Sequence, residues 1–373
     1  MHKITFFPLG NADTSLIELS NEKKILIDYA NTKDANNQYD KRIDLSSELR
    51  KILGDQKYLD VVIFTHIDTD HIQRSPEFFN LLHANMYQSE DRIDINEMWV
   101  PAAAIVEEGT VGDSRVIRQE ARYRFKKGEG IKVFSTPGQL KEWADINGVD
   151  IESRRHLIVN AGETIEDFNL YTDGLEIFVH SPFAYRTEDD SLIDRNKDSI
   201  ALNCKFYIDG TEVQFNTFSD LGSEEIKDIV NISESYKNSD RLRWDIFKSP
   251  HHCSHLSLDN VSAKDFVKPN ETVAKLFEHY SNDGPLIISS SRVISDGDYD
   301  PPNKKASDYY KQVVANKDGE FKVTMEHPTQ NSPKPLVIKI TGGGYEIEKK
   351  PYTGIAPIIS QPSERAGVKR NER

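Results

Sequence analysis

The stretch Leu59–Ile72, LDVVIFTHIDTDHI, carries the strongest signal for fold and chemistry in the sequence. Residues 59–64 are apolar except for Asp60, and they predict a buried strand of a layered α/β sheet. Four ionisable residues follow within six positions: His66, Asp68, Asp70 and His71. Imidazoles and carboxylates crowded at the end of a buried strand repel one another or lose solvation unless a cation lies between them. The stretch therefore predicts a divalent metal site, the alternative being a solvated acidic turn.

The donor types narrow the choice of metal. Imidazole nitrogen with carboxylate oxygen suits zinc, manganese or iron, and argues against a structural zinc held by thiolates. The two cysteines, Cys204 and Cys253, form no CxxC pair and cannot make a disulfide framework. We expect Cys253 to take no part in metal binding.

Three later apolar segments also run into ionisable residues. Residues 175–179 (LEIFV) lead to His180, and the second arm of a predicted hairpin at 199–217 leads to Asp220. Residues 244–248 (WDIFK) lead to a histidine-rich turn that contains His251, His252 and His255. A single histidine at a strand end is more often structural, but the repetition of the arrangement favours a shared site.

The beginning of the chain predicts an antiparallel meander. Its strands are expected at 3–7, 14–19 and 24–28, with tight polar turns between them. Asp28 ends the third strand. It is interpreted either as a carboxylate that supports the metal loop or as an ordinary turn residue.

Composition bounds the remaining possibilities. The chain has 373 residues and a formal net charge of -14, which repels nucleic acid at long range. No run of 18 apolar residues occurs, so no membrane association is expected. The N-terminus lacks the pattern of a signal peptide, and a cytoplasmic location is expected.

A basic segment interrupts this acidic sequence. Residues 114–127 (SRVIRQEARYRFKK) predict a helix that carries Arg118, Arg122 and Arg124 among aromatic residues. Basic side chains can bind a phosphate backbone, and the aromatic side chains between them can stack on bases. Basic helix faces are, however, more often simply exposed to solvent. Arg154 and Arg155 add positive charge near the next strand. These five arginines are the predicted substrate-binding residues.

The ordered series of motifs resembles the metallo-β-lactamase superfamily. It comprises HxDxDH at 66–71, a strand-end His180, a strand-end Asp220 and PHHCSH at 250–255. Asp68 stands where the commonest form of the loop has a histidine. This variant, with the opening FFPLGNADTSLIEL and the late KSPHHxS, is most similar to the hydrolase domain of ComEC/Rec2-type competence proteins. Gln73–Arg74 and the HHCS sequence depart from the glycines usual in these places.

The resemblance implies an α/β fold, the αββα four-layer sandwich, formed by residues 1–350. A mainly helical insertion is expected at about 76–155, and a flexible tail at 351–373. It also implies two divalent ions, zinc or manganese. His66, Asp68 and His180 would hold the first ion, Asp70, His71 and His251 the second, and Asp220 would bridge them. His251 is preferred over His252 as ligand because it directly follows the strand.

The implied activity is metal-dependent hydrolysis. Asp70 would orient the attacking water, and His252 or His255 would donate a proton to the leaving group. Phosphodiesters, as in a nuclease acting on DNA or RNA, are the preferred substrate class. The alternatives are a hydrolase of a small ester, lactone, lactam or cyclic nucleotide, and a non-catalytic component of a larger assembly. A protein partner on the 76–155 segment and self-association into a homo-oligomer are further expectations.

Overall fold

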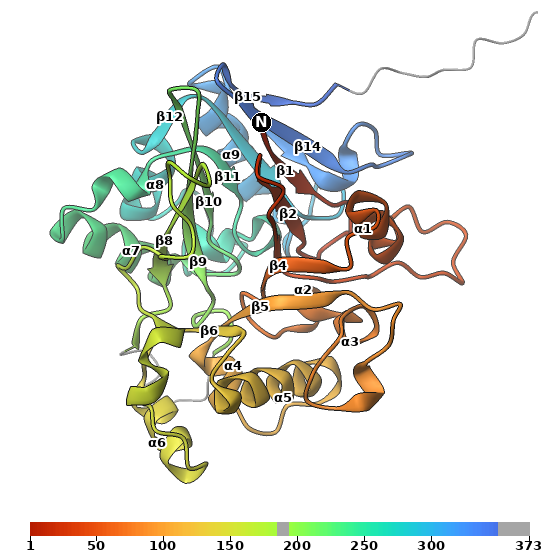
Figure 1. Cartoon of the computed structure of the whole chain (residues 1–373). Helices are drawn as coiled ribbons and strands as arrows, with labels where there is room; N and C mark the ends of the chain where they lie inside the picture. The colour runs from red at the N-terminus through yellow and green to blue at the C-terminus, as the bar shows by residue number, and fades with distance from the viewer. Residues whose placement is uncertain (185–193, 350–373) are drawn as a thin grey trace, which may run out of the picture.

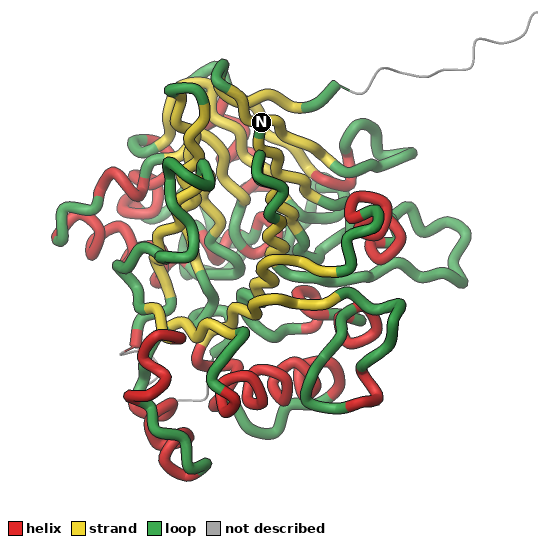
Figure 2. Tube along the Cα trace, in the orientation of Figure 1, coloured by secondary structure: helices red, strands yellow, loops and turns green. Residues whose placement is uncertain are grey.

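The computed structural model describes residues 1–184 and 194–349. Within these ranges the chain forms two β-sheets that pack face to face, with helices on the outer face of each sheet (Figures 1 and 2). The predicted tail at 351–373 lies outside the described residues.

The first sheet has the strand order β15-β14-β1-β2-β3-β4-β5-β6-β7. Strands β1, β2, β3 and β14 pair antiparallel, whereas β3 to β7 run parallel. The predicted opening meander is confirmed by this pairing. The strand bounds are β1 His2–Phe6, β2 Ser15–Glu18, β3 Lys24–Ile27, β4 Tyr58–Ile63, β5 Asp94–Pro101, β6 Ile131–Phe134, β7 Ile158–Val159, β14 Leu336–Thr341 and β15 Gly344–Ile347.

The second sheet has the order β13-β12-β11-β10-β9-β8. Its β8, β9 and β10 are antiparallel, and β10, β11, β12 and β13 are parallel. The predicted hairpin is the pair β9 and β10. The bounds are β8 Leu175–Ser181, β9 Ala201–Ile208, β10 Thr211–Thr217, β11 Trp244–Lys248, β12 Ser281–Ser289 and β13 Glu320–Val323.

Helices cover both outer faces. Helices α1, α5 and α6 pack on the first sheet, and α7, α8 and α9 pack on the second. The helix bounds are α1 Leu45–Leu53, α2 Thr69–Ile72, α3 Ser75–Phe78, α4 Ala102–Val106, α5 Gly112–Lys127, α6 Gly138–Ile146, α7 Ser223–Ser235, α8 Glu271–Glu278 and α9 Lys304–Ala315. The architecture is the predicted αββα sandwich.

Strand β4 shows why the layers form. Val62 packs towards the helices, while Val61 and Ile63 pack into the layer between the sheets. Side chains alternate between the two faces of a strand, so a strand buried on both sides must be apolar at nearly every position. The buried strand predicted at 59–64 is confirmed, and its carboxyl end delivers the HxDxDH loop.

The segment 76–155 contains both helices and strands. It contains the predicted helix at 114–127, observed as α5, but also strands β5 and β6. These strands continue the parallel half of the first sheet from β4. The segment is thus mainly helical, and it also supplies β5 and β6 as interior strands of the first sheet.

No helix in residues 1–184 or 194–349 is long and apolar enough to cross a membrane. Cys204 and Cys253 are buried free thiols, as expected from their spacing.

Candidate metal centre

Four buried side chains converge at one edge of the sandwich. Asp13 follows β1, His71 follows β4, Asp220 follows β10, and His252 follows β11. One ligand atom from each lies within 4.8 Å of the other three. We call these four residues the His/Asp cluster. The carboxyl ends of parallel strands lie at one edge of a sheet, which is why loops distant in sequence meet here.

The cluster fits a divalent cation. Oδ1 of Asp13, Nε2 of His71 and Oδ1 of Asp220 are buried and make no hydrogen bond of good geometry within the described part of the chain, although Nε2 of His71 lies 3.3 Å from Oδ1 of Asp220. Buried polar atoms are normally satisfied, so donor atoms gathered in this way fit a cation between them. Two imidazoles with two carboxylates form a donor set typical of zinc or manganese. The predicted involvement of His71 and Asp220 agrees with this arrangement.

Hydrogen bonds fix the orientation of both cluster imidazoles. Nδ1 of His71 donates to Oδ2 of Asp28 over 2.8 Å, and Nδ1 of His252 donates to the carbonyl of Ser290 over 2.8 Å. Each bond leaves Nε2 directed towards the cluster. Metal-binding histidines are commonly held in this way by a carboxylate or carbonyl. Of the two interpretations of Asp28, the supporting role is observed.

Protons balance the charge of the cluster when it holds no ion. Burial lowers the pKa of His71, but the charges of Asp220 and Asp28 outweigh it and raise that pKa well above its ordinary value. Burial also acts to lower the pKa of His252, and Asp220, Asp13 and Asp70 instead raise it to about 9. Burial acts to raise the pKa of Asp220, whereas His71 and His252 hold it well below its usual range. A cation entering the cluster would displace the two imidazole protons.

Asp13 and its partner Lys248 were not predicted as functional residues. Lys248, at the end of β11, is buried and forms an ion pair with Oδ2 of Asp13. Burial acts to raise the pKa of Asp13, but the charges of Lys248 and His252 lower it. The available sequence signal was a carboxylate in the turn before a buried strand, within the opening that supports the family resemblance.

Asp70 and His251 lie at the rim of the cluster. Oδ2 of Asp70 is 2.9 Å from Nε2 of His252. His251 is partly exposed, and its Nε2 lies 3.8 Å from Oδ2 of Asp220. Nε2 of His252 lies at a similar distance from that oxygen, 3.7 Å, but the buried imidazole within the cluster is that of His252, whereas the sequence favours His251 as ligand.

The backbone around the cluster is unusual. Five non-glycine residues beside it have positive φ: Asp28, Ser219, His251, His252 and Cys253. Such conformations cost free energy for residues with a side chain and gather at functional sites. The turn at 251–253 is anchored by the backbone N–H of His251, which donates to the carbonyl of Ser219 over 2.9 Å.

His66 and Asp68 lie next to the cluster but have different partners. Nδ1 of His66 is 3.3 Å from Oγ of Ser219, and its Nε2 is buried without a hydrogen-bond partner among the described residues. Burial, followed by the charge of His71, lowers the pKa of His66 to about 3. Asp68 lies 3.6 Å from that Nε2 and also binds Arg195, with 2.6 Å between Oδ1 and Nη1.

His180 lies away from the cluster. Its Nε2 is 3.1 Å from the carbonyl of Arg241, and its ring packs edge-on against Phe178 and Phe218. This position is on the wall of an apolar cavity of about 530 Å³ that also includes Ile229. The structure does not bring His180 together with His66 and Asp68.

His255 is also surrounded by other parts of the protein. Its Nε2 is 3.1 Å from the carbonyl of Val261, its Nδ1 is 3.4 Å from Nδ2 of Asn303, and its ring packs against Phe266. Both ring nitrogens thus face the protein, and the predicted role of His255 as proton donor has no support in this placement. His252 does lie at the site, as predicted.

The three arginines of α5 bind the protein itself. Arg118 and Arg122 donate to carbonyls of the 105–108 loop and to Glu108. Arg124 is only 2% exposed and donates to Glu120 and to the carbonyls of Ile95 and Gly130. These guanidinium groups hold neighbouring elements together, and the structure shows them bound to the protein rather than directed at the His/Asp cluster.

Arg154 has the same kind of role. Its Nε and Nη2 donate to the carbonyls of Phe125 and Lys126, at the end of α5. Arg155 lies beside it in the turn at 152–157. Arg154 therefore anchors the end of α5.

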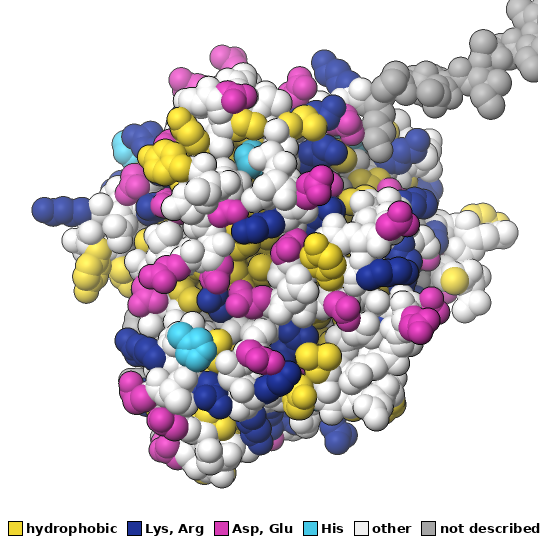
Figure 3. All heavy atoms as spheres, in the orientation of Figure 1, with side chains coloured by type: hydrophobic (Ala, Val, Ile, Leu, Met, Phe, Trp, Pro, Cys, Tyr) yellow, Lys and Arg dark blue, Asp and Glu magenta, His cyan; other side chains and the backbone are white. Residues whose placement is uncertain are grey.

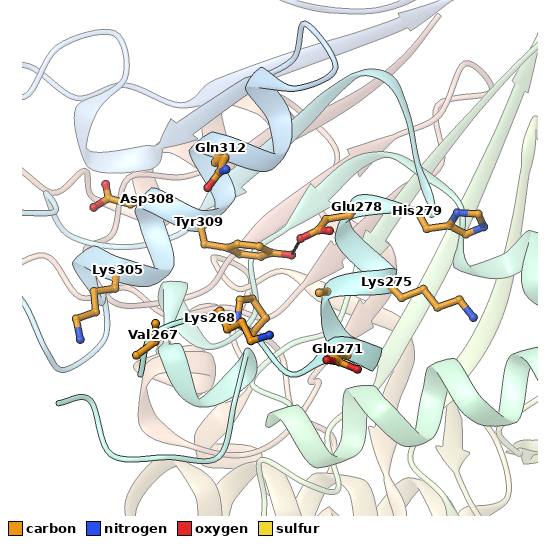
Figure 4. Close-up of a pocket in the computed structure, with 12 residues that line it drawn as sticks. Val267, Lys268, Glu271, Lys275, Glu278, His279, Lys305, Asp308, Tyr309 and Gln312 are labelled. Carbon is orange, nitrogen blue, oxygen red and sulfur yellow. Dashed lines mark hydrogen bonds between the residues drawn. The ribbon is translucent and has the colours of Figure 1, made fainter. Parts of the chain in front are cut away.

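A larger hollow of about 900 Å³ lies between α8 and α9 (Figure 4). Its polar groups bind one another and the backbone: the Tyr309 hydroxyl donates to Glu278 over 3.0 Å, and Lys305 donates to the carbonyl of Phe266 over 2.7 Å. It includes no member of the His/Asp cluster.

No protein-family model and no curated protein sequence matches the chain. Among solved structures, it is similar to unliganded yeast PDE1, at 9% identity and a TM-score of 0.44, with 86% of this chain and 97% of that chain covered. It is also similar to MEM-A1, a subclass B3 metallo-β-lactamase from a soil metagenome library, at 12% identity and a TM-score of 0.34, with 67% and 76% covered.

A third similar structure is a variant of CmlA β-hydroxylase, at 10% identity and a TM-score of 0.44, with 90% of this chain covered. The chain spans about half of that protein's length, 54%. Members of the metallo-β-lactamase superfamily are thus among the solved structures that this chain is similar to.

Proposed function

We propose that the chain is a metal-dependent hydrolase that cleaves phosphodiester bonds at the His/Asp cluster. The observation that carries this proposal is the set of orphaned buried atoms on Asp13, His71 and Asp220, with Nε2 of His252 facing them. The only internal contact among these three atoms in the described residues is the 3.3 Å approach of His71 and Asp220, and burying polar atoms so poorly paired costs free energy unless a cation binds them.

The four cluster residues would hold the cation, with Asp70 at its edge. A divalent ion in such a site supplies Lewis acidity and lowers the pKa of a coordinated water. Asp28 and the Ser290 carbonyl hold the two imidazoles in the tautomer that presents Nε2. Oδ2 of Asp70 lies 2.9 Å from Nε2 of His252, which places this carboxylate beside the cation that His252 would bind.

Three features support a phosphodiester as substrate. The carboxylate-rich donor set suits the harder divalent ions, which bind phosphoryl oxygens well. The guanidinium of Arg195, bound to Asp68 beside the cluster, adds positive charge near the opening. The resemblance of the HxDxDH variant to ComEC/Rec2-type hydrolase domains points to the same substrate class.

A small phosphodiester is favoured over a long nucleic acid. The arginines of α5 are engaged within the fold, and the net charge is -14. On the face in Figure 3, basic and acidic side chains are interspersed rather than gathered by sign. Extended nucleic acid binding depends on a continuous basic surface.

The test is hydrolysis of bis(p-nitrophenyl) phosphate and a cyclic dinucleotide by protein loaded with Zn²⁺ or Mn²⁺. Single-stranded DNA and RNA are assayed in parallel, with p-nitrophenyl acetate as the ester comparison. Asp220→Asn should abolish cleavage, whereas Asp173→Asn, a change in the Lys23 ion pair remote from the cluster, should not. Metal-loaded protein that cleaves the ester but no phosphodiester would overturn the proposed substrate class.

A further inference from the structure

The carboxylate of Asp68 is already bound by a fixed cation. Oδ1 of Asp68 lies 2.6 Å from Nη1 of Arg195. Glu107 holds the other side of the guanidinium, with Oε1 2.6 Å from Nη2 and Oε2 2.9 Å from Nε. Two-point binding of a guanidinium by a carboxylate fixes its plane as well as its position. Arg195 therefore has a defined position between two carboxylates.

The first metal site that the family resemblance implies is incomplete in this structure. Of its three expected ligands, Asp68 is bound to Arg195, and His180 is directed towards the Arg241 carbonyl. His66 alone presents a buried nitrogen without a hydrogen-bond partner in the described ranges. Zinc sites in proteins use at least three protein ligands, so one imidazole is not enough. By contrast, the His/Asp cluster brings four donors together.

The charge of Arg195 also disfavours a metal ion at Asp68. Arginine stays protonated at any pH a protein tolerates, so the guanidinium is a permanent positive charge in contact with Asp68. A divalent ion bound by that carboxylate would face the guanidinium at close range. The repulsion would remain as long as Glu107 keeps Arg195 in place. Asp68 and Glu107 share the single positive charge of Arg195.

We infer that this centre holds a single divalent cation, in the His/Asp cluster, and that Arg195 takes the position of the second cation. The inference rests on the proposed function for the first ion and adds the number of ions and the role of Arg195. A fixed, planar guanidinium is suited to the anionic oxygen of a phosphodiester, which a second metal would otherwise contact.

The experiment counts ions. Protein stripped with a chelator is reloaded with Zn²⁺ or Mn²⁺, desalted, and measured by elemental analysis and native mass spectrometry. Wild type should carry about one ion per chain, in contrast to about two for a dinuclear centre. Asp68→Asn should still carry one, because its carboxylate binds Arg195 and not metal. Asp220→Asn should carry none, and the remote Asp173→Asn should match wild type.

Arg195→Gln tests the role of the guanidinium. Its loss frees Asp68 and Glu107 beside His66, and the variant should accept a second ion at excess Mn²⁺. Circular dichroism establishes that each variant is folded. Wild type with two ions, one of which is lost in Asp68→Asn, would overturn the inference and leave the proposed function standing. Wild type with no ion would overturn the proposed function itself. An Arg195→Gln protein that still takes one ion would overturn the assignment to Arg195.

Discussion

Oδ2 of Asp28 lies 2.8 Å from Nδ1 of His71, although the two residues are 43 positions apart in the chain. The same carboxylate also accepts hydrogen bonds from the backbone N–H and hydroxyl of Thr65, each over 2.8 Å. Asp28 therefore joins the end of β3 to the loop after β4 and sets the direction of a metal-facing imidazole. Its position at the end of β3 and its burial make it the support of the centre.

Asp28→Asn should weaken metal binding about 10- to 100-fold, as is usual when the carboxylate behind a ligating histidine is lost. The amide carries no charge to favour the tautomer of His71 that presents Nε2. Competition with a chromophoric chelator measures the dissociation constant. Asp245→Asn is the matched control, because Asp245 is a largely buried carboxylate bound to Gln214 and Asn282, away from the cluster. Equal metal affinity in the two variants would show that Asp28 does not act through His71.

Substitution should distinguish the roles of the adjacent residues His251 and His252. His252→Ala removes a cluster imidazole, and we expect it to lose the ion and all hydrolysis. His251→Ala changes a partly exposed ring whose Nε2 lies 3.8 Å from Asp220, and it should keep the ion. Metal content and kcat/KM for bis(p-nitrophenyl) phosphate measure both effects. The opposite order would restore His251 as the ligand.

Arg124→Ala should destabilise the fold by about 3–5 kcal/mol, the usual cost of leaving one partner of a buried ion pair alone. Arg124 and Glu120 are both buried, and Nε and Oε1 are 2.6 Å apart. Urea denaturation followed by circular dichroism measures the free energy of unfolding. Lys127→Ala, at an exposed position on the same helix, is the control and should change little. If Arg124 instead bound substrate, KM would rise while the stability stayed constant.

The ionisation of Glu120 should make the free energy of unfolding depend on pH in the acid range. Burial acts to raise the pKa of Glu120, but hydrogen bonding to His83 and the charge of Arg124 outweigh it and lower the pKa. A carboxylate with a lowered pKa stabilises the folded state above its ordinary pKa, and this contribution is lost as the pH falls below that value. Wild type should therefore lose free energy of unfolding between about pH 5 and pH 3.

Glu120→Gln should be less stable than wild type at pH 7 and should show a shallower loss on acidification. Urea titrations at a series of pH values measure both slopes. Parallel slopes for the two proteins would mean that Glu120 does not contribute to the pH dependence.

Local patterns determined much of the fold. The apolar run at 59–64, the opening meander and the hairpin at 199–217 correspond to β4, to β1–β3, and to β9 with β10. These elements are predictable because their burial and turn chemistry are written in neighbouring residues. Strand β6 and helix α8 were not predicted. Both are short, so the spacing of their apolar residues predicts secondary structure only weakly. Strand β6 is stabilised by packing within the sheet, and helix α8 by packing on the outer face of the other sheet.

In the candidate site, too, some residues could be predicted from local sequence and others could not. His71 and Asp220 were predicted because each follows a buried strand, and a charged group at such a place requires a partner. The sequence could not distinguish His251 from His252, since adjacent residues differ in direction only through the backbone angles of the turn. Nor could it show that Arg118, Arg122 and Arg124 face carbonyl groups of their own domain, because those carbonyls come from distant loops and strands.

The sequence by itself determined that imidazoles and carboxylates stand at the ends of buried strands, and hence that a cation is required. Only the tertiary structure decided which of them meet. It brought Asp13 into the cluster, turned His180 towards Arg241, and placed Arg195 against Asp68. The physical reason is that residue type and local periodicity fix burial and charge within one segment. The distance between two segments depends on how the sheets pack, and this distance decides whether a carboxylate meets a metal ion or an arginine.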